Sequence, residues 1–316
     1  MRTVSILDRN LSSTDACTPD GIVHYGRLFD IAGDAETEVL ILNDGDESLA
    51  LAYNDVEILE EIYVGDMIQF RSDLTKVGNT SRHTTCEVYK LATPASRAGI
   101  AEPLPGDMVW LEEPVLIARF KCVLAVKQEL QRGVQPDGIV PDPWSNWIIK
   151  KKGCATMKEP AICMRSRLSQ RDCYYGGGLV NGARNVTLMA DCANRLMARE
   201  YGNIGRCRKV QKVHMFYPCY AGDYMEYHAR ILHTDGNRIT LETRCFKIGL
   251  IPEDAPFESS AEILEKSDHR YGHDRRIRSS RRKNPCFMIV DHIGIVVRDL
   301  LQRRLALPHA LSGRCL

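Results

Sequence analysis

A glycine-rich loop that leads into an amphipathic segment is the part of the sequence best suited to chemistry. Gly176, Gly177 and Gly178 follow Tyr175 and precede Asn181, a residue type that caps helix starts. Apolar residues then recur at helical spacing until Gly202, a typical helix-ending residue. The pattern predicts a glycine loop followed by a helix over residues 182–201.

The start of such a helix can hold negative charge. Its first N–H groups have no acceptor within the helix, and the helix dipole adds positive potential there. The loop could therefore bind a phosphate, or stabilise the oxygen of a thioester carbonyl as it gains charge. The alternative is a plain loop before a packed helix. Asp191 favours a functional site, because a carboxylate inside a mostly apolar helix needs a partner or a role.

The same unit occurs twice in the chain. Shifting the sequence by 157 positions, without a gap, places Asp15 on Asp172, Asp34 on Asp191 and Gly45 on Gly202. One constant offset of this kind predicts two copies of one domain. The copies differ where a site would lie, since residues 19–21 of the first copy read Pro-Asp-Gly in place of the three glycines.

The first copy contributes its own candidate chemistry. A helix is predicted over residues 27–42, and the turn sequence of residues 43–46 ends it. Asp34 and Glu38 are spaced i, i+4 on this helix and so share one face. Two carboxylates on one helix face are candidates for general acid and base work.

Each copy is predicted to be a strand, a long helix and then an antiparallel sheet. This order is expected of an α+β domain in which a sheet wraps one helix. Turn residues at 77–80 and 235–237 predict a hairpin in each copy. The predicted strands cover residues 1–11, 50–59, 66–76, 82–91 and 114–128 in the first copy, and 161–168, 210–217, 223–232, 238–249 and a last strand from 286–297 in the second.

Composition narrows the class of protein. The chain has 316 residues, a net charge of +1 and 12 cysteines without zinc-like spacing, so we expect a cytoplasmic protein with neither nucleic acid nor membrane as partner. Cys173 or Cys192 could be a reactive thiol beside the loop. The predicted layout is a first domain at 1–132, a Pro-rich linker at 133–160, a second domain at 161–252, and a tail at 253–316 whose basic run we expect to be disordered.

The layout resembles the hot-dog fold of acyl-CoA thioesterases and dehydratases. Several stretches are similar, more specifically, to the ammonia-lyases that act on 3-aminobutyryl-CoA and β-alanyl-CoA. The similarity covers about residues 11–127 and 164–249. It rests on MRSRLSQRD (164–172), YGGGLVNGAR (175–184), GDAETE (33–38), NDGDE (43–47), AYNDVEIL (52–59), GD (65–66) and TKVGNTSR (75–82).

The resemblance implies that hot-dog units pair side by side and build their active sites from both partners. We therefore expect two tandem hot-dog domains that form a pseudo-dimer within one chain. The family places the glycine loop and the G-D-x-x-T-E helix in one domain. Here the first copy keeps Gly33, Asp34, Thr37 and Glu38 but lacks the glycines, and the second keeps the glycines but has Arg195 at the glutamate position. One composite site is expected, with the loop from the second copy and the carboxylates from the first.

The activity that the resemblance implies is removal of ammonia from a short 3-aminoacyl-CoA, or its addition to the enoyl-CoA, as in lysine fermentation. Glu38 or Asp34 would be the base, with Asp191 a further catalytic candidate. Tyr175, Asn181 and the three glycines would bind the thioester oxygen. Arg82, Lys76 and Arg238, on or beside hairpins, would contact coenzyme A phosphates.

Two other functions remain open on the sequence. An acyl-CoA thioesterase, or an enzyme of the enoyl-CoA hydratase type, would use the same oxygen-binding loop. A non-catalytic acyl-CoA-binding subunit would need no base. No metal or redox cofactor is expected, since coenzyme A is part of the substrate, and the chain is expected to form homo-oligomers.

Overall fold

The computed structural model describes residues 4–126, 161–173, 178–215, 219–250, 262–263 and 287–296. The predicted linker, nearly all of the predicted tail with its basic run, and Tyr175, Gly176 and Gly177 lie outside the described residues. No helix in the described part of the chain has both the length and the apolar character that crossing a membrane requires.

Two long helices occupy the predicted places. α3 spans Gly182–Tyr201, with the Asn181 side chain accepting a hydrogen bond from the Ala183 N–H at its start and Gly202 in the left-handed region, φ 67°, at its end. α1 spans Gly26–Asp44 and ends at Gly45, φ 71°. The predicted caps of α3 and its bounds are confirmed, while α1 extends slightly beyond residues 27–42 at both ends.

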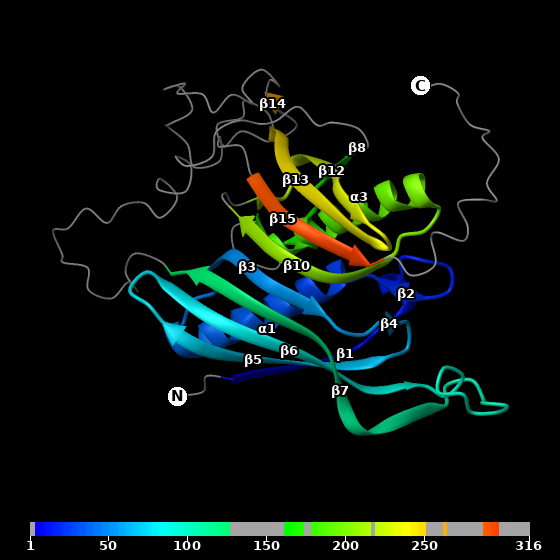
Figure 1. Ribbon diagram of the computed structural model, residues 1–316. Helices are drawn as coiled ribbons and strands as arrows, with labels where there is room; N and C mark the ends of the chain where they lie inside the picture. Colours follow the sequence, from blue (N-terminus) through cyan, green and yellow to red (C-terminus); the bar gives the residue numbers. More distant parts are fainter. Residues whose placement is uncertain are drawn as a thin grey trace.

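One antiparallel sheet runs through both halves of the chain. Its strand order is β1-β5-β6-β7-β3-β10-β15-β13-β12-β8, with β14 (Glu262–Ile263) beside β13. Figure 1 shows both helices against the same side of this sheet. The strands are β1 (Val4–Asn10), β3 (Leu49–Ile58), β5 (Met67–Val77), β6 (Ser81–Pro94), β7 (Met108–Ala125), β8 (Ala161–Arg167), β10 (Arg206–Met215), β12 (Tyr224–Asp235), β13 (Arg238–Leu250) and β15 (Phe287–Val296).

Short strands and hairpins complete the two halves. β2 (Ile22–Val23) pairs with β4 (Ile62–Tyr63), and β9 (Leu179–Val180) pairs with β11 (Cys219–Tyr220). β15 lies between β10 and β13, where the sequence placed a last strand for the second copy. Both predicted hairpin turns lie between paired strands, at 78–80 and 236–237.

The offset of 157 residues also relates contacts in the structure. Asp8 lies opposite Gln69 in the β1–β5 pair, and Arg165 lies opposite Glu226 in the β8–β12 pair. The ion pair between Asp66 and Lys90, at 2.9 Å, likewise corresponds to the one between Asp223 and Lys247, at 2.7 Å. The two halves therefore share their element order and strand register.

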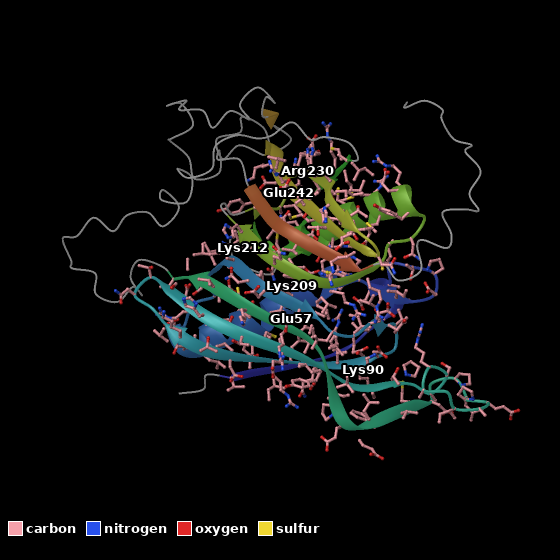
Figure 2. All side chains as sticks on the ribbon, in the orientation of Figure 1. Glu57, Lys90, Lys209, Lys212, Arg230 and Glu242 are labelled. Atoms are coloured by element: carbon pink, nitrogen blue, oxygen red, sulfur yellow. The ribbon has the colours of Figure 1, made fainter. Side chains whose placement is uncertain are left out.

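β3 and β10 join the two halves edge to edge. Their register places Glu57 opposite Lys209, and Figure 2 shows both side chains on the seam. Backbone ladder hydrogen bonds across this seam extend each half-sheet into the other, as in a dimer of two such units. The fold is thus the α+β pseudo-dimer that the sequence predicts.

Each half buries its own core between helix and sheet. In the first half Phe29 of α1 meets Tyr53 and Phe120 edge to face, with ring centroids 5.0 and 4.9 Å apart. In the second half Met189 of α3 is buried with Tyr227 and Leu241. Edge-to-face packing suits aromatic rings and contributes about 0.5–1.5 kcal/mol per pair beyond burial.

The core of the first half also contains a carboxyl group. Glu36 of α1 is 1% exposed and accepts a hydrogen bond from the Tyr53 hydroxyl at 2.9 Å. Burial raises the pKa of Glu36 to about 8, so the side chain is mostly protonated at neutral pH. Ala193 occupies the corresponding position of α3 and is also buried.

We predict that Glu36→Gln makes stability less dependent on pH. In the unfolded chain this group ionises near 4.5. Between pH 4.5 and 8 the folded state therefore holds a proton that the unfolded state has lost, and stability falls as the pH rises. The wild type should lose up to about 5 kcal/mol across this window. Glutamine still accepts from Tyr53 and cannot ionise, so the variant should lose much less.

Urea unfolding at pH 5 and pH 8.5 measures this difference. The same substitution at the exposed Glu112 serves as a control and should leave the pH dependence of the wild type in place. Equal pH dependence in wild type and Glu36→Gln would contradict the assignment of Glu36 as a buried acid.

Candidate active site between the two helices

The two helices run antiparallel and pack unusually close at two points. A Cβ atom built on Gly26 would lie 2.9 Å from the Cβ of Ala190, and one built on Gly33 would lie 3.5 Å from the Cβ of Ala183. The Thr187 hydroxyl, between these points, donates to the Gly26 carbonyl oxygen at 2.7 Å. Side chains from distant parts of the sequence therefore meet at both ends of the contact.

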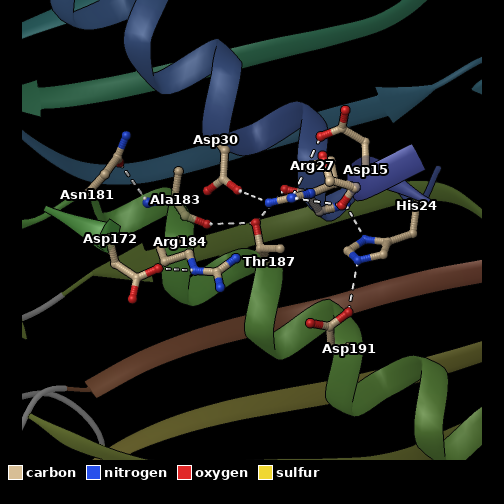
Figure 3. Close-up of polar contacts among 12 residues, drawn as sticks. Asp15, His24, Arg27, Asp30, Asp172, Asn181, Ala183, Arg184, Thr187 and Asp191 are labelled. Carbon is tan, nitrogen blue, oxygen red and sulfur yellow. Dashed lines mark hydrogen bonds and ion pairs between the residues drawn. The ribbon is translucent and has the colours of Figure 1, made fainter. Parts of the chain in front are cut away.

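At one end, Asn181 lies against Gly33. Asn181 is 4% exposed, and its Oδ1 accepts from the Ala183 N–H at 2.9 Å (Figure 3). Because this bond fixes which atom is the oxygen, Nδ2 points the other way, 3.1 Å from where a Cβ of Gly33 would be. Nδ2 has no hydrogen-bond acceptor within the described residues. A buried donor of this kind is costly, and a ligand oxygen would satisfy it.

Asp34 follows Gly33, the α1 residue against which Asn181 lies. Its side chain is exposed, yet the protein around it partly removes it from water. This desolvation, with the charge of Asp30 adding to it and Arg9 opposing it, raises the pKa of Asp34 to about 6. A carboxylate that titrates near neutral pH is suited to accept a proton.

Asp30 sits between groups of both halves. It accepts a hydrogen bond from Arg27 at 3.3 Å and lies close to Thr187 and Arg184 (Figure 3). Burial raises the pKa of Asp30, and these three groups oppose the rise without cancelling it. Arg184 itself pairs with Asp172 at 2.7 Å.

Glu38 lies four residues beyond Asp34 on α1, about 6 Å along the axis. It is exposed, and its carboxylate accepts a hydrogen bond from the Ser5 hydroxyl of β1. Gly178, the one glycine of the loop within the described residues, adopts φ 73°, a conformation that favours glycine. The structure thus brings Asn181 of the second half against Gly33 of α1 in the first half.

The other end of the helix contact is built differently. His24 and Asp191 correspond to Asn181 and Asp34 under the offset of 157, and His24 Nε2 lies 2.9 Å from Asp191 Oδ1. His24 Nδ1 accepts from the Gly26 N–H at 2.9 Å (Figure 3). An imidazole that accepts at Nδ1 carries its proton on Nε2 and is neutral, with both nitrogens in use.

This second end offers no comparable donor. The imidazole proton is directed at Asp191, and the N–H of Gly26 is directed at the imidazole. Asp191 therefore has a partner across the halves and lies about 15 Å along α3 from Asn181. The catalytic role of Asp191 stays a prediction. His24 was not among the predicted site residues, although the offset of 157 places it at the position of Asn181.

The three residues predicted to contact coenzyme A phosphates differ in burial. Arg82 is 1% exposed, and its Nε and Nη2 each donate to a different carboxylate oxygen of Asp44 at 2.9 Å. It also donates to the carbonyl oxygens of Gly78 and Ser81. The prediction that Arg82 contacts coenzyme A is therefore wrong, because the hairpin and helix end bury it. Lys76 and Arg238 are exposed, and their role stays a prediction.

Neither candidate cysteine is activated. Burial, the largest influence, raises the pKa of the buried Cys192 to about 12. Burial also raises the pKa of Cys173. Both groups therefore remain thiols at neutral pH and are poor nucleophiles.

Solved structures confirm the fold class. A structure from Lactobacillus plantarum described as an oleoyl thioesterase matches 94% of this chain and 98% of its own, with a TM-score of 0.54 at 11% identity. A thioesterase structure from Novosphingobium aromaticivorans matches 93% and 96%, with a TM-score of 0.52 at 8% identity. The pseudo-dimer has the hot-dog fold of thioesterases.

Sequence comparison narrows the class to a family. No protein-family model matches the chain. The 3-aminobutyryl-CoA ammonia lyase of Acetoanaerobium sticklandii is 36% identical over 128 residues, which are 40% of this chain and 98% of the relative. The β-alanyl-CoA:ammonia lyase of Clostridium propionicum is 30% identical over 43% of this chain and 93% of its own, with a TM-score of 0.38. The chain belongs to the 3-aminobutyryl-CoA ammonia lyase family, a family of carbon–nitrogen lyases.

We predict that Arg82→Ala destabilises the fold without weakening acyl-CoA binding. Removing one partner of a buried ion pair leaves the other charge uncompensated and costs about 3–5 kcal/mol. Urea unfolding should show this loss, whereas the exposed Lys76→Ala should unfold like the wild type. A stable Arg82→Ala protein with weakened acyl-CoA binding would contradict the structural role.

Proposed function

We propose that the chain eliminates ammonia from a short 3-aminoacyl-CoA such as 3-aminobutyryl-CoA, and adds it in reverse, at the Asn181–Asp34 site. One observation carries the proposal: a buried amide donor that has no acceptor among the described residues faces Gly33, next to a carboxylate whose pKa is about 6. Family membership supports the reaction type. The relatives match about two fifths of this chain, roughly one half of the pseudo-dimer.

The reaction needs a hydrogen-bond donor at the thioester oxygen. Removing the proton next to the carbonyl carbon moves negative charge onto that oxygen. Asn181 Nδ2 would donate to it, and the positive end of α3 behind Asn181 would add to the stabilisation. One donor of this kind elsewhere contributes about 3 kcal/mol to the transition state. Gly178, with Gly176, Gly177 and Tyr175 before it, would shape the approach of the thioester.

Asp34 would be the base. With a pKa of about 6 it is mostly ionised at pH 7 and can take the proton from the carbon next to the carbonyl. The electrons of the broken C–H bond form the new carbon–carbon double bond, and the C–N bond breaks. The amine leaves as ammonia, which takes the proton now held by Asp34 and departs as ammonium. Glu38, one turn away, would attract the ammonium group of the substrate.

The sister end would not catalyse the same step, because its donors are used in the His24–Asp191 contact. One lyase site per chain follows. Coenzyme A is part of the substrate, and the steps above need no further cofactor. Lys76 and Arg238 would contact its phosphates. A role in lysine fermentation, a cytoplasmic location and assembly into homo-oligomers complete the proposal.

An absorbance assay tests the reaction. Purified chain, crotonyl-CoA and ammonium should lose the enoyl-thioester signal without releasing free coenzyme A, which a thiol reagent would detect. The rate should rise with pH through about 6 as Asp34 ionises. Asp34→Asn should abolish activity, and Asn181→Ala should lower kcat about a hundredfold.

Other outcomes of this assay decide between the alternatives. Free thiol released without ammonium would make the protein a thioesterase. No change in either signal would favour an acyl-CoA-binding subunit. An active Asp34→Asn protein beside an inactive Glu38→Gln protein would move the role of base to Glu38.

We predict that Gly33→Ala reduces activity while the fold stays stable. Alanine favours a helix by about 1 kcal/mol over glycine. Its methyl group, however, would crowd Asn181 Nδ2 at 3.1 Å and Oδ1 at 3.4 Å, and so displace the donor. The expected result is a lower kcat with an unchanged or higher melting temperature. Full activity in Gly33→Ala would contradict the placement of Asn181 at the reacting group.

A further inference from the structure

The outer face of the second half gathers three side chains of metal-binding type. Cys163 of β8 lies directly opposite His228 of β12, and Glu226 precedes His228 by two residues on the same strand. The alternate residues of β12, Met225, Tyr227 and Ala229, are buried in the core beside α3. Glu226 and His228 therefore point to the opposite side of the sheet, where Glu226 is covered, at 3% exposed, and His228 is partly exposed. One ligand atom from each of the three residues lies within 4.8 Å of the other two.

We propose that Cys163, Glu226 and His228 form a binding site for Zn²⁺. A thiolate, an imidazole and a carboxylate are the donor set of zinc, whereas Mg²⁺ and Ca²⁺ prefer oxygen alone. Zinc bonds of 2.0–2.3 Å place tetrahedral ligand atoms about 3.5 Å apart. Side-chain movements of about 1 Å would bring the three atoms to this spacing. Water would fill the fourth position.

The hydrogen bonds of Glu226 already suit this arrangement. Its Oε2 accepts from Arg165 Nε at 2.7 Å and lies 2.7 Å from Arg165 Nη2. Its Oε1 faces His228 Nε2 at 2.7 Å. A zinc ion replacing the proton between Oε1 and Nε2 would leave Arg165 on the other oxygen. Such partners orient the ligands of metal sites.

The first half provides an internal comparison. The corresponding positions carry Ile6, Gln69 and Arg71, and the polar network there links Gln69 to Asp8 and Arg71 to Gln69 at 2.9 and 2.7 Å. The fold therefore needs only a polar cross-strand link at this place. The second half has a metal-ligand type at all three positions.

Ordinary ion pairs do occur on the same face, such as Arg230 with Glu242 at 2.5 Å (Figure 2). They combine basic and acidic groups and contain no thiol. The proposed site would tie β8, the last strand of the sheet, to β12. Its role would be structural, since it lies on the face of the sheet opposite to the helices and their Asn181–Asp34 site.

Zinc binding to the full metal-free chain tests the proposal, in competition with a coloured chelator. One zinc ion per chain is expected, with affinity rising with pH because the thiol and imidazole must lose protons. Cobalt should give a thiolate charge-transfer absorption. Cys163→Ile and His228→Arg, which introduce the residues of the first half, should each weaken zinc binding tenfold or more. Cys163→Ile should also abolish the cobalt absorption.

The exposed Cys17, far from β8 in sequence, provides the control. Cys17→Ser should bind zinc like the wild type. Three results would overturn the proposal. They are a chain that holds no zinc against the chelator, zinc binding as tight as that of the wild type in both Cys163→Ile and His228→Arg, and loss of the cobalt absorption in Cys17→Ser. Circular dichroism of each variant shows that the fold is intact. The lyase assay, which uses other residues, is read separately.

Discussion

The close antiparallel contact of α1 and α3 is the constraint on which the rest of the structure depends. Gly26 faces Ala190, and Gly33 faces Ala183. Under the offset of 157, Gly26 corresponds to Ala183 and Gly33 to Ala190, so each contact contains one glycine and one alanine. Both glycines belong to α1. The first half thus supplies the space that lets the second half approach, and a side chain at Gly26 would collide with the Cβ of Ala190.

The two ends of this helix contact differ in their polar residues, although equivalent positions of the two halves form them. At one end Asn181 keeps a donor that has no acceptor within the described residues, whereas at the other end His24 and Asp191 contact each other. His24 and Asn181 accept equivalent backbone N–H groups, from Gly26 and Ala183. The ends differ because the second imidazole nitrogen of His24 lies 2.9 Å from the Asp191 carboxylate. The two ends therefore differ in the hydrogen bonds that the residues at positions 24 and 181 make.

The sequence predicted features that local signals determine. The bounds of α3, its caps and both hairpins follow from periodicity, Asn181, Gly202 and turn residues. Features that depend on tertiary burial were not predicted. Arg82 and Glu36 look like ordinary charged residues in sequence, and only the packed hairpin and core show one ion-paired and the other protonated. Cys163 is likewise distant in sequence from Glu226 and His228, and strand pairing alone brings them together.

The β3–β10 seam lies within one polypeptide, and this has a consequence for dilution. A site formed between two separate subunits is lost when the protein concentration falls below the dissociation constant of the dimer. Here the second half is always present at the effective concentration that the covalent connection sets. The contact between α1 and α3 therefore stays assembled at any protein concentration. Because each half is encoded separately, a substitution at one end of the helix contact also leaves the other end unchanged.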